Sequence, residues 1–182
     1  MSNPSYVEEA RRSFREYKLL AEGAFTQLQP DEWLRTIDSE ANSVGAIVKH
    51  MAGNMRSRWT DFLTSDGEKP DRNRDQEFVL DTSTSPEQIK NWWEAGWQCV
   101  FQAMGPLQEN DLARTVRIRG RELTVLQAVN RQVTHYAYHV GQIVLLAKHF
   151  RGAEWKSLSI PKGQSALAGV QAEAARKARG EK

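Results

Sequence analysis

Apolar residues recur at spacings of three and four positions along four stretches of the chain, which is the pattern of helices that bury one face. Two of these stretches begin with a capping box, in which side chains bond reciprocally to the free backbone N–H groups of the first turn. One box pairs Ser85 with Gln88 and places Pro86 at the first helical position, and the other pairs Thr124 with Gln127. The predicted helices cover residues 6–28, 44–63, 86–104 and 125–150. Four helices of this length predict an all-α four-helix bundle.

The segments that join the last three predicted helices differ in character. SDGEKPDRNRDQEFVLDTSTS is polar and rich in turn-forming residues, so we expect a long loop between the second and third helices, with a short strand at residues 78–80. TVRIRGREL alternates apolar residues with arginines ahead of Gly120, which predicts a short β-ribbon before the fourth helix. No aromatic residue interleaves with the arginines between Arg114 and Arg121 to stack on bases, so a solvated ribbon is favoured over a nucleic-acid contact.

Length and charge limit the classes of protein that the sequence can encode. The 182 residues suffice for one domain, which we place at residues 1–165, followed by a charged tail at residues 166–182. The formal net charge is +2, and the last twelve residues alone carry four Lys or Arg and two Glu, so the domain itself is close to neutral. A neutral domain exerts no general attraction on nucleic acid or anionic lipid. The chain has no apolar stretch of about 18 to 20 residues and no secretory signal, so we expect a cytoplasmic protein that does not span a membrane.

His135 and His139 lie four positions apart in the fourth predicted helix, so their imidazoles share one face and can reach a single ion. A single cysteine cannot form a multi-cysteine zinc site, and a catalytic zinc site needs three protein ligands, so His50 of the second helix is the natural third ligand. Core packing is the alternative for each of these side chains. Tyr136 stands where the HExxH motif needs its glutamate, which disfavours a zinc protease of that class. His149, in the last helical turn, is expected at the surface.

Four polar residues near these histidines are candidates to orient an imidazole or to contact a substrate. They are Asn54 and Arg58, one and two turns after His50, and Arg131 and Gln142 on the fourth helix. A guanidinium suits a carboxylate because its planar fork donates two parallel hydrogen bonds. The alternative for Arg131 is an ion pair with a glutamate elsewhere in the bundle.

The residues around these histidines resemble a known family. VNRQVTHYAYHVGQIVLLAK, with GAIVKHMAGNMRSRW upstream and WKSLSIPKGQS downstream, is similar to the DinB-like superfamily of damage-inducible bacterial proteins, within a branch of uncharacterised function. The resemblance covers residues 6–165. It implies a four-helix bundle with an up-up-down-down helix order, a homodimer, and one divalent ion per chain held by His50, His135 and His139. Zinc and nickel are the favoured ions, with manganese and iron as alternatives.

The resemblance also implies a small-molecule substrate, because characterised relatives include transferases and isomerases that use low-molecular-weight thiols. Our first hypothesis is a metal-dependent transferase that activates such a thiol, since metal binding lowers the pKa of the thiol and no motif carboxylate stands ready as a base. The second hypothesis is a hydrolase that uses metal-bound hydroxide, with Asp66 or Glu68 as the base. The third is a non-enzymatic dimeric stress protein with a structural metal.

Overall fold

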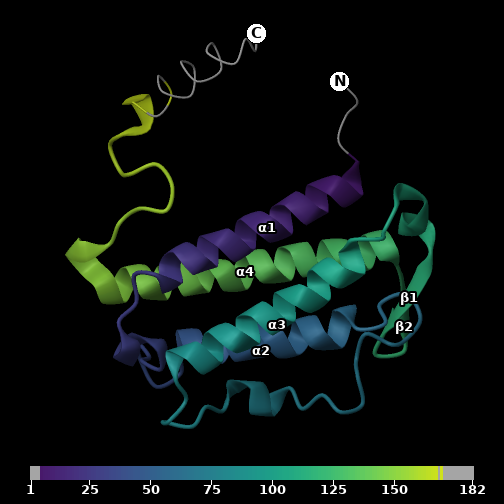
Figure 1. Cartoon of the computed structure of the whole chain (residues 1–182), viewed down its shortest axis with the longest axis horizontal. Coiled ribbons are helices and arrows are strands. Elements are labelled where there is room, and N and C mark those ends of the chain that lie inside the picture. The colour runs from purple at the N-terminus through teal and green to yellow at the C-terminus, as the bar shows by residue number, and fades with distance from the viewer. Residues whose placement is uncertain (1–4, 168, 170–182) are drawn as a thin grey trace.

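The computed structural model describes residues 5–167 and residue 169, and most of these residues are helical (Figure 1). The long helices are α1 (Tyr6–Phe25), α2 (Val44–Trp59), α3 (Pro86–Met104) and α4 (Val125–Arg151). Short 3-10 helices lie in the connections: η1 (Pro30–Trp33), η2 (Asp75–Phe78), η3 (Glu109–Ala113) and η4 (Gly152–Glu154). Strands β1 (Thr115–Ile118) and β2 (Arg121–Thr124) pair antiparallel before α4. The expected mainly helical structure with a short β-ribbon is therefore confirmed.

The helix starts follow from the capping residues in the sequence. Thr124 accepts a hydrogen bond from the backbone N–H of Gln127, and the Gln127 side chain returns one to the N–H of Thr124. Ser85 caps α3 by accepting from the N–H of Gln88. The end of α2 differs from the expected residue 63, because Thr60 has an extended conformation and Asp61 has a φ of 50°. That left-handed conformation cannot continue a right-handed helix.

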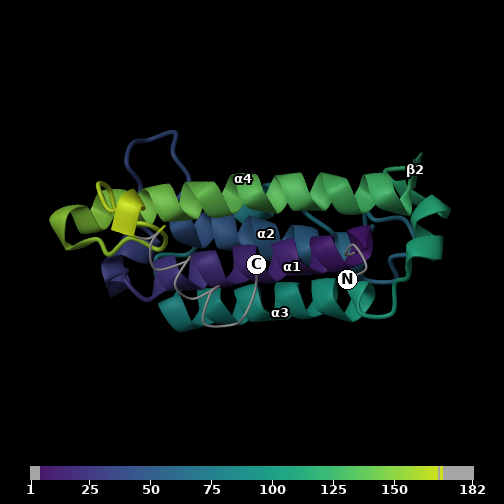
Figure 2. The ribbon, with the colours of Figure 1, turned by 90° about the horizontal axis from the view of Figure 1, so that it is seen from above.

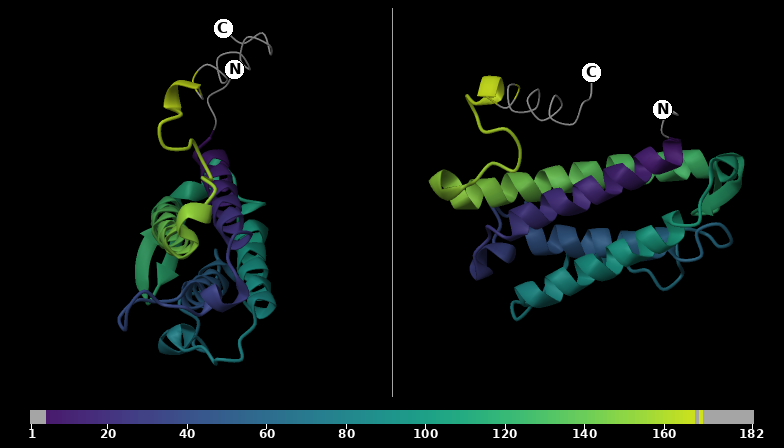
Figure 3. Two further views of the ribbon diagram at one scale, coloured as in Figure 1. Left: turned by 90° about the vertical axis from the view of Figure 1, so that its left-hand side faces the viewer. Right: turned by 45° about the horizontal axis from the view of Figure 1, so that its top comes forward.

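The long helices run in the order up-down-down-up, so the up-up-down-down order implied by the resemblance is wrong (Figure 1). α1 and α4 are parallel, because Gln27 after the end of α1 bonds to the backbone of Lys156 after the end of α4. α3 runs opposite to α1, since Arg11 near the start of α1 donates to the carbonyl of Met104 at the end of α3. The connection at residues 60–85 explains this order. It runs back along α2, so α3 starts at the end of the bundle where α2 also starts (Figures 1 and 3).

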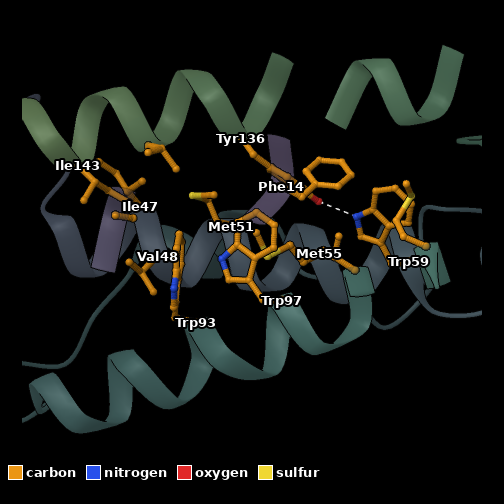
Figure 4. Close-up of a cluster of buried hydrophobic side chains, with 14 of the residues drawn as sticks. Phe14, Ile47, Val48, Met51, Met55, Trp59, Trp93, Trp97, Tyr136 and Ile143 are labelled. Carbon is orange, nitrogen blue, oxygen red and sulfur yellow. Dashed lines mark hydrogen bonds between the residues drawn. The ribbon is translucent and has the colours of Figure 1, made fainter. Parts of the chain in front are cut away.

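The core lies between a layer of α1 and α4 and a layer of α2 and α3 (Figures 2 and 3). Large side chains fill it, and those drawn in Figure 4 include three tryptophans, two methionines and Phe14. Nε1 of Trp59 donates to the hydroxyl of Tyr136 at 2.9 Å, which ties α2 to α4. Phe14 of α1 packs on both rings with centroids 5.7 Å apart. These contacts hold α2 and α4 side by side.

The loop between α2 and α3 packs on α2 without forming the strand expected at residues 78–80. Phe78 ends η2 and stacks on the imidazole of His50, with ring centroids 4.7 Å apart. Lys49 donates to the carbonyl of Val79 at 2.7 Å. A strand needs a neighbouring strand to pair its backbone N–H and C=O groups. Here the nearest element is a helix, whose side chains face the loop. The expectation of a strand is therefore wrong.

Within residues 5–167, no helix combines the length and the apolar character needed to cross a membrane. The predicted tail at residues 166–182 lies almost wholly outside the described residues. The boundary between the domain and the tail therefore stays a prediction.

Candidate metal centre

Three histidines far apart in the sequence converge between α2 and α4. His50 comes from the middle of α2, and His135 and His139 come from successive turns of α4. One ring nitrogen of each residue lies within 4.8 Å of the others. The ring centroids are between 4.6 and 5.5 Å apart. The structure therefore brings together the three predicted ligands in a cluster that could hold a metal ion.

Two hydrogen bonds set the tautomers of the cluster. Nδ1 of His50 bonds to Oε2 of Glu77 at 2.8 Å, and Nδ1 of His139 bonds to Oε1 of Gln142 at 2.8 Å. A carboxylate and an amide oxygen only accept, so in the neutral rings both Nδ1 atoms carry the proton and both Nε2 atoms carry a lone pair. Nε2 of His139 lies 3.0 Å from Nε2 of His135. Nitrogens bound tetrahedrally to zinc at about 2.0–2.1 Å lie roughly 3.3 Å apart, so the spacing of this pair is close to that needed to share one ion.

Burial keeps His135 and His139 neutral. Desolvation, aided by the charges of nearby histidines and arginines, lowers the pKa of His135 to about 3. Desolvation likewise lowers the pKa of His139 to about 4, against a hydrogen bond with Gln142 that raises it. The neutral imidazole is the form that binds a metal. The chemistry of the donor set therefore fits a divalent ion.

Glu77 is a residue of the site that sequence analysis missed. Its buried carboxylate bonds to Nδ1 of His50 and accepts from Nε of Arg72 at 2.7 Å. Burial raises the pKa of Glu77, but the bonds from His50 and Arg72 outweigh that effect and hold the pKa below its usual range. The contact with His50 spans 27 positions, and Glu77 lies in a polar loop without periodicity. No signal in the sequence marks this carboxylate as the partner of a histidine.

Gln142 and Asn54 take different places around the cluster. Gln142 touches a ligand candidate directly, because its side-chain oxygen bonds to His139, and its amide nitrogen donates to the hydroxyl of Tyr138 at 3.1 Å. Asn54 is buried and accepts a hydrogen bond from the hydroxyl of Tyr136 at 3.2 Å. Gln142 therefore orients an imidazole, and Asn54 lies beside the cluster and completes the bonds of a core residue.

A cavity of about 440 Å³ opens beside the cluster, and His50 and His135 are part of its wall. Arg58 and Arg131 also line it, as do three arginines that sequence analysis did not single out, Arg72, Arg74 and Arg119. Arg58 is buried and donates to the carbonyl of Gly67 and to the carboxylate of Glu68. Arg131 is exposed and has no ion-pair partner among residues 5–167. The predicted alternative of a bundle salt bridge for Arg131 is therefore not observed in the described part of the chain.

Asp66 and Glu68, the candidate bases of the hydrolytic hypothesis, are engaged elsewhere. Asp66 accepts from the backbone N–H groups of Arg119 and Gly120 at 2.8 and 2.6 Å. Glu68 pairs with Arg58 and Arg119, each at 2.9 Å. Desolvation opposes ionisation of both carboxyls, but these bonds hold their pKa values below the usual range. Carboxylates stabilised in this way are poor proton acceptors.

One family model matches almost the whole chain. The family is described as protein of unknown function (DUF1572), and its model matches residues 2–164. No curated protein matches the sequence. His50, His135 and His139 all fall inside the matched residues. Since the match extends over far more than half of the chain, the protein belongs to the DUF1572 family.

Proposed function

We propose that the chain binds one divalent metal ion through His50, His135 and His139, with zinc or nickel favoured over manganese or iron. The observation that carries the proposal is the convergence of these imidazoles from two helices, with Nδ1 of two of them bonded to Glu77 and Gln142. Structural zinc sites use four protein ligands, whereas catalytic sites use three and leave one position open. Three histidines therefore correspond to the catalytic class.

The same features support placing the chain in the DinB-like superfamily as a four-helix bundle. The long helices α1 to α4 pack around one core. The three histidines lie on the second and fourth of these helices, as the resemblance implies. This placement motivates the reaction class proposed next.

The reaction that we propose is the transfer of a low-molecular-weight thiol to an electrophilic small molecule. A divalent ion supplies Lewis acidity, which lowers the pKa of a coordinated thiol by several units. The residues of the chain supply the cavity beside His50 and His135, where both reactants can be held close together. A thiolate needs no general base once it has formed. The engagement of Asp66 and Glu68 in other bonds therefore favours this reaction over hydrolysis.

Metal content tests the proposed site. Elemental analysis of protein purified without a histidine tag should find about one divalent ion per chain, and the His50→Ala, His135→Ala and His139→Ala variants should each lose it. His149→Ala is the matched control, because His149 is exposed at the end of α4 and should leave the metal in place. Absence of metal from the wild-type protein under every loading condition contradicts the proposal.

Activity assays distinguish thiol transfer from the alternatives. The loaded protein is incubated with glutathione or cysteine and chlorodinitrobenzene. In this reaction the thiol releases its proton to the buffer, the sulfur–carbon bond forms, the carbon–chlorine bond breaks and chloride leaves. Thiol-dependent turnover that disappears in His135→Ala supports the transferase. Hydrolysis of a nitrophenyl ester in thiol-free buffer favours the hydrolase instead. A loaded protein that is inert in both assays supports the structural metal of the third hypothesis.

A further inference from the structure

Positive charge is concentrated in the cavity beside the histidine cluster. Its wall holds five arginines: Arg58, Arg72, Arg74, Arg119 and Arg131. Three of the five bond to the carboxylates of Glu68 and Glu77. Arg74 and Arg131 have no carboxylate partner among residues 5–167. The wall thus has an excess of three positive charges over these two carboxylates, or of two if Asp66 on the adjacent loop is included.

Two buried polar atoms of the cavity wall have no hydrogen-bond partner. One is Nε of Arg58, whose side chain is 5% exposed and whose terminal nitrogens are already bonded to Gly67 and Glu68. The other is Oε1 of Gln132, which is 3% exposed. The amide of Gln132 can offer either its oxygen or its NH₂ group after a half-turn. Tyr6 and Trp97, which do not line this cavity, also keep an unpaired polar atom. The feature that points to an anionic ligand is therefore the excess of arginines over carboxylates in the wall.

We propose that this cavity binds the anionic group, a carboxylate or a phosphate, of the small molecule that reacts at the histidine cluster. The inference rests on the proposed function and specifies the class of its substrate. The guanidinium groups of Arg74 and Arg131, which have no carboxylate partner, meet the anion at the exposed side, and the charge of Arg58 attracts it from the buried side. A guanidinium binds such oxygens through paired N–H groups, at fixed geometry. Glu68 holds Arg58 in the wall.

The dimensions of the cavity favour a small anion over a macromolecule. A volume of about 440 Å³ falls within the range of roughly 300 to 1,000 Å³ that is usual for small-molecule sites. The side chains of Arg58 and Arg72 are 5% and 2% exposed, so a flat nucleic-acid backbone cannot reach them. The anion would also lie next to His50 and His135, which places the rest of the ligand near the proposed metal.

Titration calorimetry with inorganic phosphate and with malonate, at constant ionic strength, tests the inference. We expect saturable binding of at least one of them to the purified protein, and at least tenfold weaker binding to the Arg74→Gln/Arg131→Gln double variant. Arg117→Gln is the matched control, since Arg117 lies on the same hairpin as Arg119, is exposed and pairs with Glu122. Tighter binding of phosphate or of malonate identifies the anion class. A wild-type protein that binds neither anion overturns the inference.

Gln132→Glu tests the same cavity without removing an arginine. The change is nearly isosteric and places a negative charge in the arginine-lined wall, where it repels a bound anion. We expect at least tenfold weaker binding of phosphate and malonate, and circular dichroism checks that the variant is folded. Unchanged anion binding in this variant and in the arginine double variant overturns the inference.

A His139→Ala arm separates this inference from the proposed function. Both anions can also coordinate a metal directly, so binding that disappears with His139 belongs to the metal and overturns the arginine site. Binding that persists in His139→Ala supports the arginine site without any metal. Failure to find metal in the wild-type protein contradicts the proposed function, whereas failure to find anion binding in a metal-loaded protein contradicts only the inference.

Discussion

Glu77 bonds to Nδ1 of His50 at 2.8 Å, although 27 positions separate the two residues. The loop after α2 brings η2 back along the helix that carries His50, and Arg72 holds Glu77 by donating from Nε and from a terminal nitrogen. A carboxylate in this place fixes the orientation and the tautomer of the imidazole. Glu77 is therefore a positioning residue for the proposed metal site.

Glu77→Gln should weaken metal binding without removing a ligand. The amide can still accept from His50, but its NH₂ group then faces the donors of Arg72, so the side chain is no longer held. Loss of such an outer partner typically costs about 10- to 100-fold in metal affinity. Competition with a chromogenic chelator measures the change. Glu87→Gln, at an exposed position of α3, is the control and should keep wild-type affinity.

Gly53→Ala should weaken metal binding, although alanine favours the helix more than glycine does. Gly53 lies within α2, where alanine is normally favoured by about 0.5–1 kcal/mol. A Cβ at this position would overlap Oε1 of Glu77, so the carboxylate must move away from His50. We expect weaker metal binding by the same chelator assay. Gly141→Ala on α4 meets open space and should raise the melting temperature with no loss of metal affinity. Equal affinity in both variants would contradict the role of Glu77.

Tyr136→Phe should destabilise the fold. The Tyr136 hydroxyl is fully buried, accepts from Nε1 of Trp59 and donates to Oδ1 of Asn54. Its removal leaves both partners unpaired in the core, which costs about 1–3 kcal/mol in the free energy of unfolding. Urea denaturation measures the difference. Tyr138→Phe is the control, because Tyr138 is 62% exposed and its loss should change stability by no more than about 0.5 kcal/mol.

Asp66→Asn should lower the melting temperature near neutral pH. The difference from the wild-type protein should become smaller as the pH is lowered. Backbone N–H groups of Glu68, Gly120 and Arg119 outweigh desolvation and hold the pKa of Asp66 below its usual value of 3.8. A pKa that is lower in the folded chain than in the unfolded chain stabilises the fold at pH values above the unfolded-state pKa. This contribution disappears as the pH falls through the folded-state pKa. Melting curves recorded by circular dichroism across that range test the sign. A constant difference between variant and wild type at all pH values would contradict it.

The helices and the spacing of the clustered histidines are the features that local sequence describes well. A period of 3.6 residues and the cap at Thr124 specify α4, and the four-position spacing of His135 and His139 puts both on one face of it. These relations depend on neighbours within one turn, so they hold in any fold that keeps the helix. The prediction that His50 lies beside them requires only that the second and fourth helices pack side by side.

Features that depend on contacts between distant segments were either missed or predicted wrongly. The helix order depends on the path of residues 60–85, and loop-closure entropy is nearly indifferent to which end a long connection reaches. The strand expected at residues 78–80 is absent because Phe78, the last residue of η2, stacks on His50 and residues 79–80 have no partner strand. The arginine-lined cavity likewise draws residues from α2, the following loop, the hairpin and α4.

The sequence alone thus determined the helices and the placement of His135 and His139 on one face of α4, and it singled out His50 as the third member of the cluster. Periodicity and capping act over a few residues, so they can be read without the fold. Only the tertiary structure decided which carboxylate holds His50, how the helices are ordered and where the arginines gather. Those outcomes depend on side-chain packing between segments whose separation in sequence carries no information about their separation in space.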